Sequence, residues 1–149
     1  MDLIKYSHAC FVLEKDGQSL VVDPGMWSKD FQCPDNVVAI VITHDHPDHL
    51  DHEMLADIAA KNPEVLLYAH ATVTASLRDT AVSVKAGDTV SVGTFSLTFT
   101  GGEHVLIDSS LPRIANLGVM VDGLVYYPGD SFAMPPVAVE HLLLPVSAP

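Results

Sequence analysis

The sequence predicts a mixed fold of the α/β or α+β class, in which sheets pack between helices. A continuous β-branched run at residues 37–43 is typical of a strand buried on both faces, and an amphipathic helix pattern follows at residues 53–61. From residue 82 onward the pattern changes to short strands separated by turns that contain glycine. The 149 residues are enough for one domain with a real core and too few for two.

The first half of the chain begins with two predicted strands, at residues 4–14 and 19–23, on either side of a polar turn at residues 15–18. Residues 23–25, Asp-Pro-Gly, form a turn signal that ends the second strand. The helix at residues 53–61 has its apolar side chains on one stripe and ends before an Asn-Pro pair.

The second half continues with a strand at residues 65–68 and a short helix at residues 71–78. The remaining strands are predicted at residues 82–84, 89–92, 95–100, 114–121, 124–127 and 142–144. The Asp122-Gly123 pair between two of these strands is the strongest short hairpin signal in the chain.

The composition limits the classes of partner. The 7 basic and 19 acidic residues give a net charge of −12, which argues against nucleic acid or an anionic membrane as an extended partner. A small anionic substrate remains compatible, because a bound dication reverses the local field. No apolar run approaches the ~20 residues of a membrane span, and the N-terminus lacks the pattern of a signal peptide. We therefore expect a cytoplasmic protein, with Cys10 as a reduced core thiol.

Residues 44–49, His-Asp-His-Pro-Asp-His, place three imidazoles and two carboxylates directly after the predicted buried strand. Residues two apart point the same way in an extended loop, so His44 and His46 can bind one ion together. Asp48 and His49 follow where the chain turns toward the helix, and they can bind a second ion. Such ligands suit zinc, or manganese or iron, and paired ions imply hydrolysis. A solvated polar loop without metal is the alternative interpretation.

Residues 43–49, Thr-His-Asp-His-Pro-Asp-His, resemble the signature of the metallo-β-lactamase-fold hydrolases. Residues 6–14 and 20–25 resemble the opening strands of that superfamily, most closely in the branch containing ascorbate-6-phosphate lactonase. Residues 101–104, Gly-Gly-Glu-His, resemble the segment that carries the next ligand histidine. Residues 127–131, Tyr-Pro-Gly-Asp-Ser, resemble the segment that carries the aspartate bridging both ions.

The resemblance implies a metallo-β-lactamase-like αβ/βα sandwich with a centre for two divalent ions. It implies that His44, His46 and His104 surround one ion. It also implies that Asp48 and His49 bind the other. A polar loop histidine is the alternative interpretation of His104.

The resemblance further implies that Asp130 bridges the two ions and that Asp48 also handles protons as the catalytic carboxylate. The alternative for Asp130 is an ordinary turn aspartate. His8 is a candidate for substrate binding, and a structural histidine is the alternative. Asp23 either orients a ligand histidine from behind or caps a turn.

The superfamily pattern requires one more histidine, on a strand near the C-terminus. His141 is the only later histidine, and it lies too close to Asp130 for a strand-helix-strand unit between them, so we do not assign it as a ligand. Residues 146–149 resemble an internal segment. We therefore expect residues 1–149 to form one domain that is C-terminally incomplete. Three explanations remain open: the sequence is truncated, the protein is a naturally short member of the superfamily, or a second chain supplies the missing part. Each Å² of apolar surface that stays exposed to water costs about 25 cal/mol of stability. We therefore expect another copy or a partner chain to cover the edge that the incomplete sandwich exposes.

The sequence thus predicts a metal-dependent hydrolase that directs a metal-bound hydroxide at an ester, lactone or phosphoester of a small molecule. A β-lactam substrate is not favoured, because nothing in the chain resembles an export signal. The alternative is a metal-binding but catalytically weak subunit, or a truncated domain that needs a partner chain, because one ligand is missing.

Overall fold

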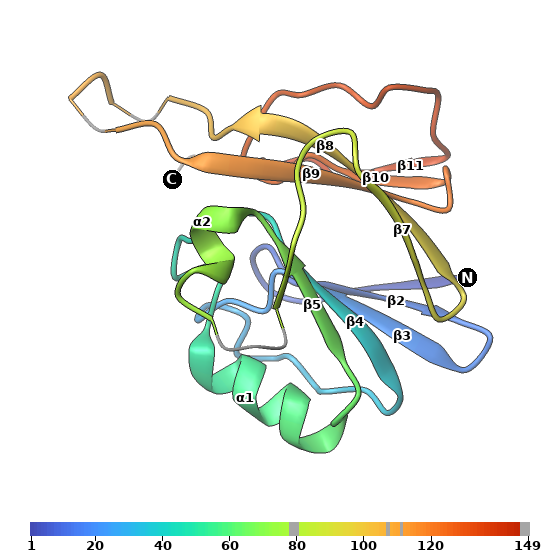
Figure 1. Cartoon of the computed structure of the whole chain (residues 1–149). Helices are drawn as coiled ribbons and strands as arrows, with labels where there is room; N and C mark the ends of the chain where they lie inside the picture. Colours follow the sequence, from blue (N-terminus) through green and yellow to red (C-terminus); the bar gives the residue numbers. More distant parts are fainter. Residues whose placement is uncertain (78–80, 107, 111, 147–149) are drawn as a thin grey trace.

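The computed structural model of the chain describes residues 1–77, 81–106, 108–110 and 112–146, and these form two stacked β-sheets (Figure 1). The strands of the first sheet are β1 (Asp2–Lys5), β2 (Phe11–Lys15), β3 (Gln18–Val22), β4 (Val37–Ile42), β5 (Leu66–Ala69) and β6 (Ala81–Ser83). The helices are α1 (His52–Lys61) and α2 (Ala71–Thr74). The strands of the second sheet are β7 (Thr89–Val92), β8 (Phe95–Glu103), β9 (Ala115–Val121), β10 (Val125–Tyr127) and β11 (His141–Leu142).

The order of strands in the first sheet follows the chain, from β1 to β6. Strands β1, β2 and β3 pair antiparallel, whereas β3, β4, β5 and β6 run parallel. The second sheet has the order β11-β10-β9-β8-β7, and all its pairs are antiparallel except β10 with β11. Loops follow the strands of both sheets at one end of the molecule, and these loops carry the polar side chains of the candidate site.

The central strands of the first sheet are buried on both faces. Phe11 and Val41 pack between the sheets, whereas Val12 and Ile40 pack under the helices. Consecutive side chains of a strand point to opposite faces, so each of these strands contributes to both apolar clusters. The prediction of a doubly buried strand at residues 37–43 is therefore confirmed.

The prediction of one continuous strand at residues 4–14 is wrong. The chain turns between β1 and β2, where the amide of Tyr6 donates to the carbonyl of Cys10 at 3.0 Å. Within this turn His8 has a φ of 56°, which non-glycine residues adopt uncommonly. The ammonium of Lys5 donates to the carbonyls of Tyr6, His8 and Cys10 and so replaces strand hydrogen bonds. The apolar pattern of the sequence does not reveal this local side-chain contact.

Other elements agree with prediction or differ at their ends. The helix predicted at residues 53–61 is α1, and β9 and β10 form the predicted hairpin. Asp122 and Gly123 have φ values of 53° and 69° in its turn, as two-residue hairpin turns require. The helix predicted at residues 71–78 is shorter, because α2 ends at Thr74; the last residue of that range lies outside the described residues.

Both helices pack against the first sheet, and α1 lies on the side away from the second sheet (Figure 1). In the described part of the second half, residues 81–106, 108–110 and 112–146, no helix covers the second sheet. The prediction of sheets packed between helices therefore holds on one side only. No helix among the described residues is long and apolar enough to cross a membrane.

Exposed apolar side chains gather in the chain segment after β10, where Phe132 is 82%, Met134 77% and Val146 93% exposed. In the same region β11 forms an open edge of the second sheet. We propose that a second copy of the chain covers this surface, because exposed apolar surface and open strand edges favour association. Light scattering after gel filtration should give a dimer or larger species, and Phe132→Ser with Met134→Ser should shift it toward monomer. Leu3→Ser, on β1, is the matched control; a monomeric wild-type chain would contradict the proposal.

Candidate metal centre

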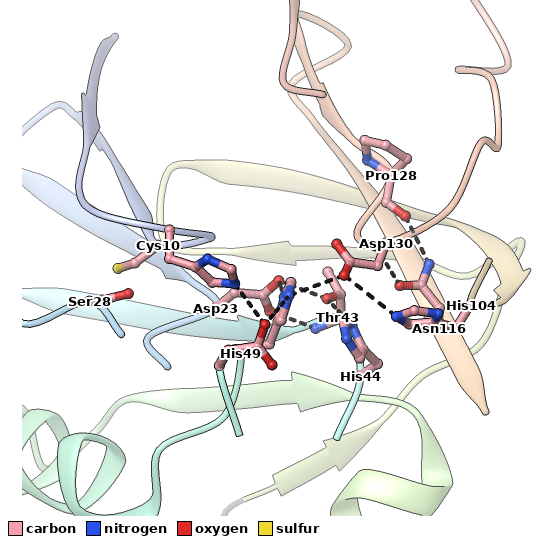
Figure 2. Close-up of polar contacts among 12 residues, drawn as sticks. Cys10, Asp23, Ser28, Thr43, His44, His49, His104, Asn116, Pro128 and Asp130 are labelled. Atoms are coloured by element: carbon pink, nitrogen blue, oxygen red, sulfur yellow. Dashed lines mark hydrogen bonds and ion pairs between the residues drawn. The ribbon is translucent and has the colours of Figure 1, made fainter. Parts of the chain in front are cut away.

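The predicted ligand residues come from three separate loops that meet at one end of the stacked sheets. Residues 44–49 follow β4, His104 follows β8, and Asp130 follows β10 after a turn at Pro128. Figure 2 shows the side chains of His44, His49, His104 and Asp130 turned toward one another. The structure thus brings together residues up to 86 positions apart, since Asp130 and His44 lie in one group.

His44, His46 and His104 form the first group, and their ligand nitrogens all lie within 4.8 Å of one another. The ring centroids of each pair are 4.8 Å apart. His44 and His104 are buried, and His46 is partly exposed. Three convergent imidazoles with one open side are typical of a catalytic zinc site.

Hydrogen bonds fix the tautomers of the two buried imidazoles. His104 donates from Nδ1 to the carbonyl of Val105 at 2.7 Å, and a carbonyl can only accept. The hydroxyl of Thr43 donates to the carboxylate of Asp23 at 2.7 Å, so it accepts from Nδ1 of His44 at 3.0 Å. In both imidazoles Nε2 therefore carries the lone pair.

Those two Nε2 atoms, of His44 and His104, are the buried side-chain polar atoms without a hydrogen-bond partner in the described part of the chain. A buried acceptor without a partner costs roughly 1–3 kcal/mol, so a group that binds these two nitrogens would be stabilising. A divalent cation fits this position, because it would accept both lone pairs and because neutral imidazole is a common metal ligand. The residues present therefore fit a metal ion.

His44, His49 and Asp130 form a second group, whose ligand atoms all lie within 4.8 Å of one another, and His49 lies beside three carboxylates. Its Nδ1 donates to Asp23 Oδ2 at 2.8 Å, and its Nε2 lies 3.7 Å from Asp48 Oδ2 and 3.5 Å from Asp130 Oδ2. His44 and His49 stack with ring centroids 4.0 Å apart, so the two groups adjoin. Two carboxylates facing one imidazole nitrogen favour a positive charge at that point.

Asp23 holds the two groups together from behind. It is fully buried and accepts from the amide of Thr43 at 2.8 Å, from the Thr43 hydroxyl at 2.7 Å and from His49 at 2.8 Å (Figure 2). Its φ of 47° turns the chain at the end of β3 and directs the carboxylate inward. Of the two interpretations from sequence, these contacts favour the orientation of a ligand histidine.

The charges of the site shift its pKa values in opposite directions. Burial, with the nearby charge of His49, lowers the pKa of His44 to about 2. Burial alone would lower the pKa of His49, but Asp23 and Asp130 outweigh it and raise that pKa to about 10. Burial opposes ionisation of Asp130, yet its hydrogen bond to His49 and the surrounding imidazoles lower its pKa to about 2. Without metal, an imidazolium at His49 thus supplies the positive charge that the carboxylates favour.

Asn116 is a residue of the site that the sequence analysis missed. It is fully buried on β9, its amide donates to the carbonyl of Pro128 at 2.8 Å, and its Oδ1 accepts from the amide of Asp130 at 3.0 Å. These bonds fix the turn that presents Asp130. The sequence signal that could have identified Asn116 is its amide side chain, which interrupts the apolar run of residues 114–121.

Gly25 allows two loops to approach closely. The amide of Met26 donates to the carbonyl of Pro47 at 2.9 Å, and a Cβ added at Gly25 would lie 1.8 Å from the backbone oxygen of Asp48. Gly25→Ala must therefore displace the backbone that carries Asp48 and His49. We expect about 1–3 kcal/mol of destabilisation and weaker metal binding, measured by thermal melting and chelator competition.

The control for that substitution is Gly102→Ala, because a Cβ at Gly102 meets no atom within 4 Å. Equal metal affinity of the Gly25 and Gly102 variants would contradict the expected coupling between the loop at residues 24–26 and the ligand loop.

A cavity of about 230 Å³ adjoins the first group of histidines. His46 and His104 form part of its lining. Its other lining residues are Val105, Leu106, Asp108, Pro112, Arg113 and Ile114. The guanidinium of Arg113 pairs with Glu103 at 2.5 Å and is 59% exposed, so it is accessible from the cavity mouth.

The remaining histidines and acids of the sequence analysis lie outside this cavity. His8 does not line that cavity; its Nε2 donates to Asp48 Oδ2 at 2.7 Å. Asp45 is exposed. His141 is exposed on β11 and pairs with Val125, at the far end of β10 from Asp130. Among the described residues His141 belongs to none of the candidate metal-binding groups.

Two stacked sheets with a His/Asp centre on the loops after β4, β8 and β10 define the class of metallo-β-lactamase-fold proteins. The chain belongs to this superfamily: the family model described as the beta-lactamase superfamily domain matches residues 2–147. The predicted family and fold class are therefore confirmed.

Relatives and solved structures agree with this placement. The chain is 32% identical to the protein Rv0786c of Mycobacterium tuberculosis in an alignment 154 positions long. The alignment covers 100% of the chain and 73% of that protein. It is 28% identical to a UPF0173 metal-dependent hydrolase of Chelativorans, over 88% of the chain and 63% of that protein. The crystal structure of a proposed metal-dependent hydrolase from Parabacteroides distasonis superposes with a TM-score of 0.82 at 25% identity, over 99% of this chain and 70% of that one.

Proposed function

We propose that the protein is a metal-dependent hydrolase of small-molecule esters, lactones or phosphoesters. The observation that carries the proposal is the pair of buried, unprotonated Nε2 atoms of His44 and His104, which face His46 and have no hydrogen-bond partner among the described residues. Membership of the superfamily supports it, as do relatives that are named metal-dependent hydrolases.

The donor set suggests how two ions would be held. We assign His44, His46 and His104 to one ion. We assign Asp48 and His49 to the other, and Asp130 to a position between them. Zinc suits this mixture of imidazole and carboxylate best, with manganese or iron as alternatives. A divalent ion bound there would lower the pKa of a coordinated water to about 7 and polarise the bond to be cleaved.

The chain's own residues would bind the substrate and move the proton. Asp48 is partly exposed and has both His8 and His49 beside it, so its carboxylate can accept a proton from an attacking water and pass it to a leaving group. The apolar wall of the cavity beside His46 would hold the acyl or alkyl part of a substrate and exclude water. Arg113 at its edge would attract an anionic group.

Metal removal tests the proposal. Purified protein should contain two equivalents of zinc, manganese or iron per chain and should hydrolyse 4-nitrophenyl acetate, bis(4-nitrophenyl) phosphate or a simple lactone. Dialysis against a chelator should abolish turnover and addition of metal should restore it. About one equivalent with little turnover would favour the catalytically weak subunit, and an absence of bound metal would contradict both interpretations.

A further inference from the structure

His8 occupies a strained and tightly held position beside the second group of ligands. Its φ of 56° lies in the left-handed region, and the ammonium of Lys5 binds the carbonyl of His8 itself. On the other side of the turn, the amide of Ser7 donates to the carboxylate of Asp30 at 2.9 and 3.1 Å. The hydroxyl of Ser28 donates to the carbonyl of Ser7 at 3.1 Å. Backbone strain that is fixed from several sides is typical of functional positions.

The imidazole of His8 is also fixed in direction. It packs edge-on against Trp27, with ring centroids 4.8 Å apart at 85°, and against His49, at 5.6 Å and 81°. This packing directs Nε2 at Asp48 Oδ2, 2.7 Å away. Ligands that share one tetrahedral ion at bond lengths of about 2.1 Å lie about 3.4 Å apart, so the two atoms need to separate by only about 0.7 Å to share an ion.

His8, Asp48 and His49 form a third group whose ligand atoms all lie within 4.8 Å of one another. His8 lies 40 positions before Asp48 in the sequence, so this group depends on the turn between β1 and β2. His141, the late histidine in the sequence, belongs to no such group among the described residues. The only imidazole that joins Asp48 and His49 in a described group is therefore that of His8.

We propose that His8 is a direct ligand of the second metal ion, on which it joins Asp48, His49 and Asp130. This inference rests on the two-ion centre of the proposed function. A cation held by both His8 Nε2 and Asp48 Oδ2 would replace the proton of the hydrogen bond that joins them in the metal-free chain. Zinc and cadmium are both compatible with such a donor set of imidazole and carboxylate. The second ion then receives its additional imidazole from the beginning of the chain.

Nuclear magnetic resonance tests the assignment without any activity measurement. The probe is whole protein labelled with ¹⁵N-histidine and loaded with two equivalents of ¹¹³Cd²⁺. Each ligating imidazole nitrogen should show one-bond coupling to cadmium. The expected result is coupling at His8 as well as at His44, His46, His49 and His104. Coupling at His49 with an unsplit His8 signal would overturn the proposal and leave the proposed function intact. Complete absence of coupling would overturn both.

A variant pair supports the measurement. His8→Asn removes the imidazole but keeps a residue that tolerates the left-handed region, so the turn can remain folded. The second cadmium equivalent should bind at least about 10-fold more weakly in this variant, with the first equivalent unchanged. His52→Asn is the matched control, because His52 is exposed on α1 and lies outside all three groups among the described residues. Equal affinity of His8→Asn and His52→Asn for the second equivalent would overturn the proposal.

Discussion

Replacing His46 with alanine is expected to lower kcat/KM about 10²–10³-fold. Loss of one ligand weakens the binding of an ion that would stabilise the charge of the transition state by several kcal/mol. His46 is partly exposed, so its removal adds no further unpaired buried polar atom to those of His44 and His104. The thermal midpoint of the metal-free protein should therefore change little. Metal content should fall with turnover, which elemental analysis and steady-state kinetics would measure on the same preparation.

The control for that experiment is His141→Ala, which removes an exposed imidazole on β11. Its turnover and metal content should match those of the unmodified chain. If His46→Ala retained full turnover, or if His141→Ala lost it, the assignment of the first ion to His44, His46 and His104 would be wrong.

Replacing Asp23 with alanine is expected to have the largest effect on stability. The substitution leaves the amide and hydroxyl of Thr43 and the Nδ1–H of His49 buried without their acceptor. Breaking a buried, hydrogen-bonded charge in this way costs about 3–5 kcal/mol. For a chain of this length the midpoint of thermal unfolding should fall by about 10 °C.

Asp45→Ala provides the comparison, since Asp45 is an exposed carboxylate in the same ligand loop. Its midpoint should lie within about 2 °C of the unmodified chain, as for most surface substitutions. Equal melting of the Asp23 and Asp45 variants would show that the buried carboxylate does not hold the loop.

The part of the site that could be predicted from sequence is the part encoded locally. Residues 44–49 place their ligands within one loop after an apolar strand, and strand burial follows from β-branched composition alone. Gly25 and Asn116 carry no comparable local signal. Their importance depends on contacts with Asp48 and Pro128, which exist only once separate loops have met. A single sequence does not specify those long-range approaches.

The same distinction explains the error at the start of the chain. The β-branched and apolar residues near Phe11 favour a strand, and nothing in them shows that Lys5 binds three carbonyls and closes a turn. Tertiary hydrogen bonds override strand propensity there. The turn that was missed also carries His8, so the error concealed the contact of His8 with Asp48.

The buried carboxylate of Asp23 has a consequence for how metal would be acquired. Through Thr43 it is connected to an imidazole of the first ion, and through a direct bond to an imidazole of the second. One buried carboxylate therefore supports a ligand of each ion at the same time. Loss of this carboxylate should therefore weaken the binding of both ions, and metal titration of Asp23→Ala should show a lower affinity for each equivalent.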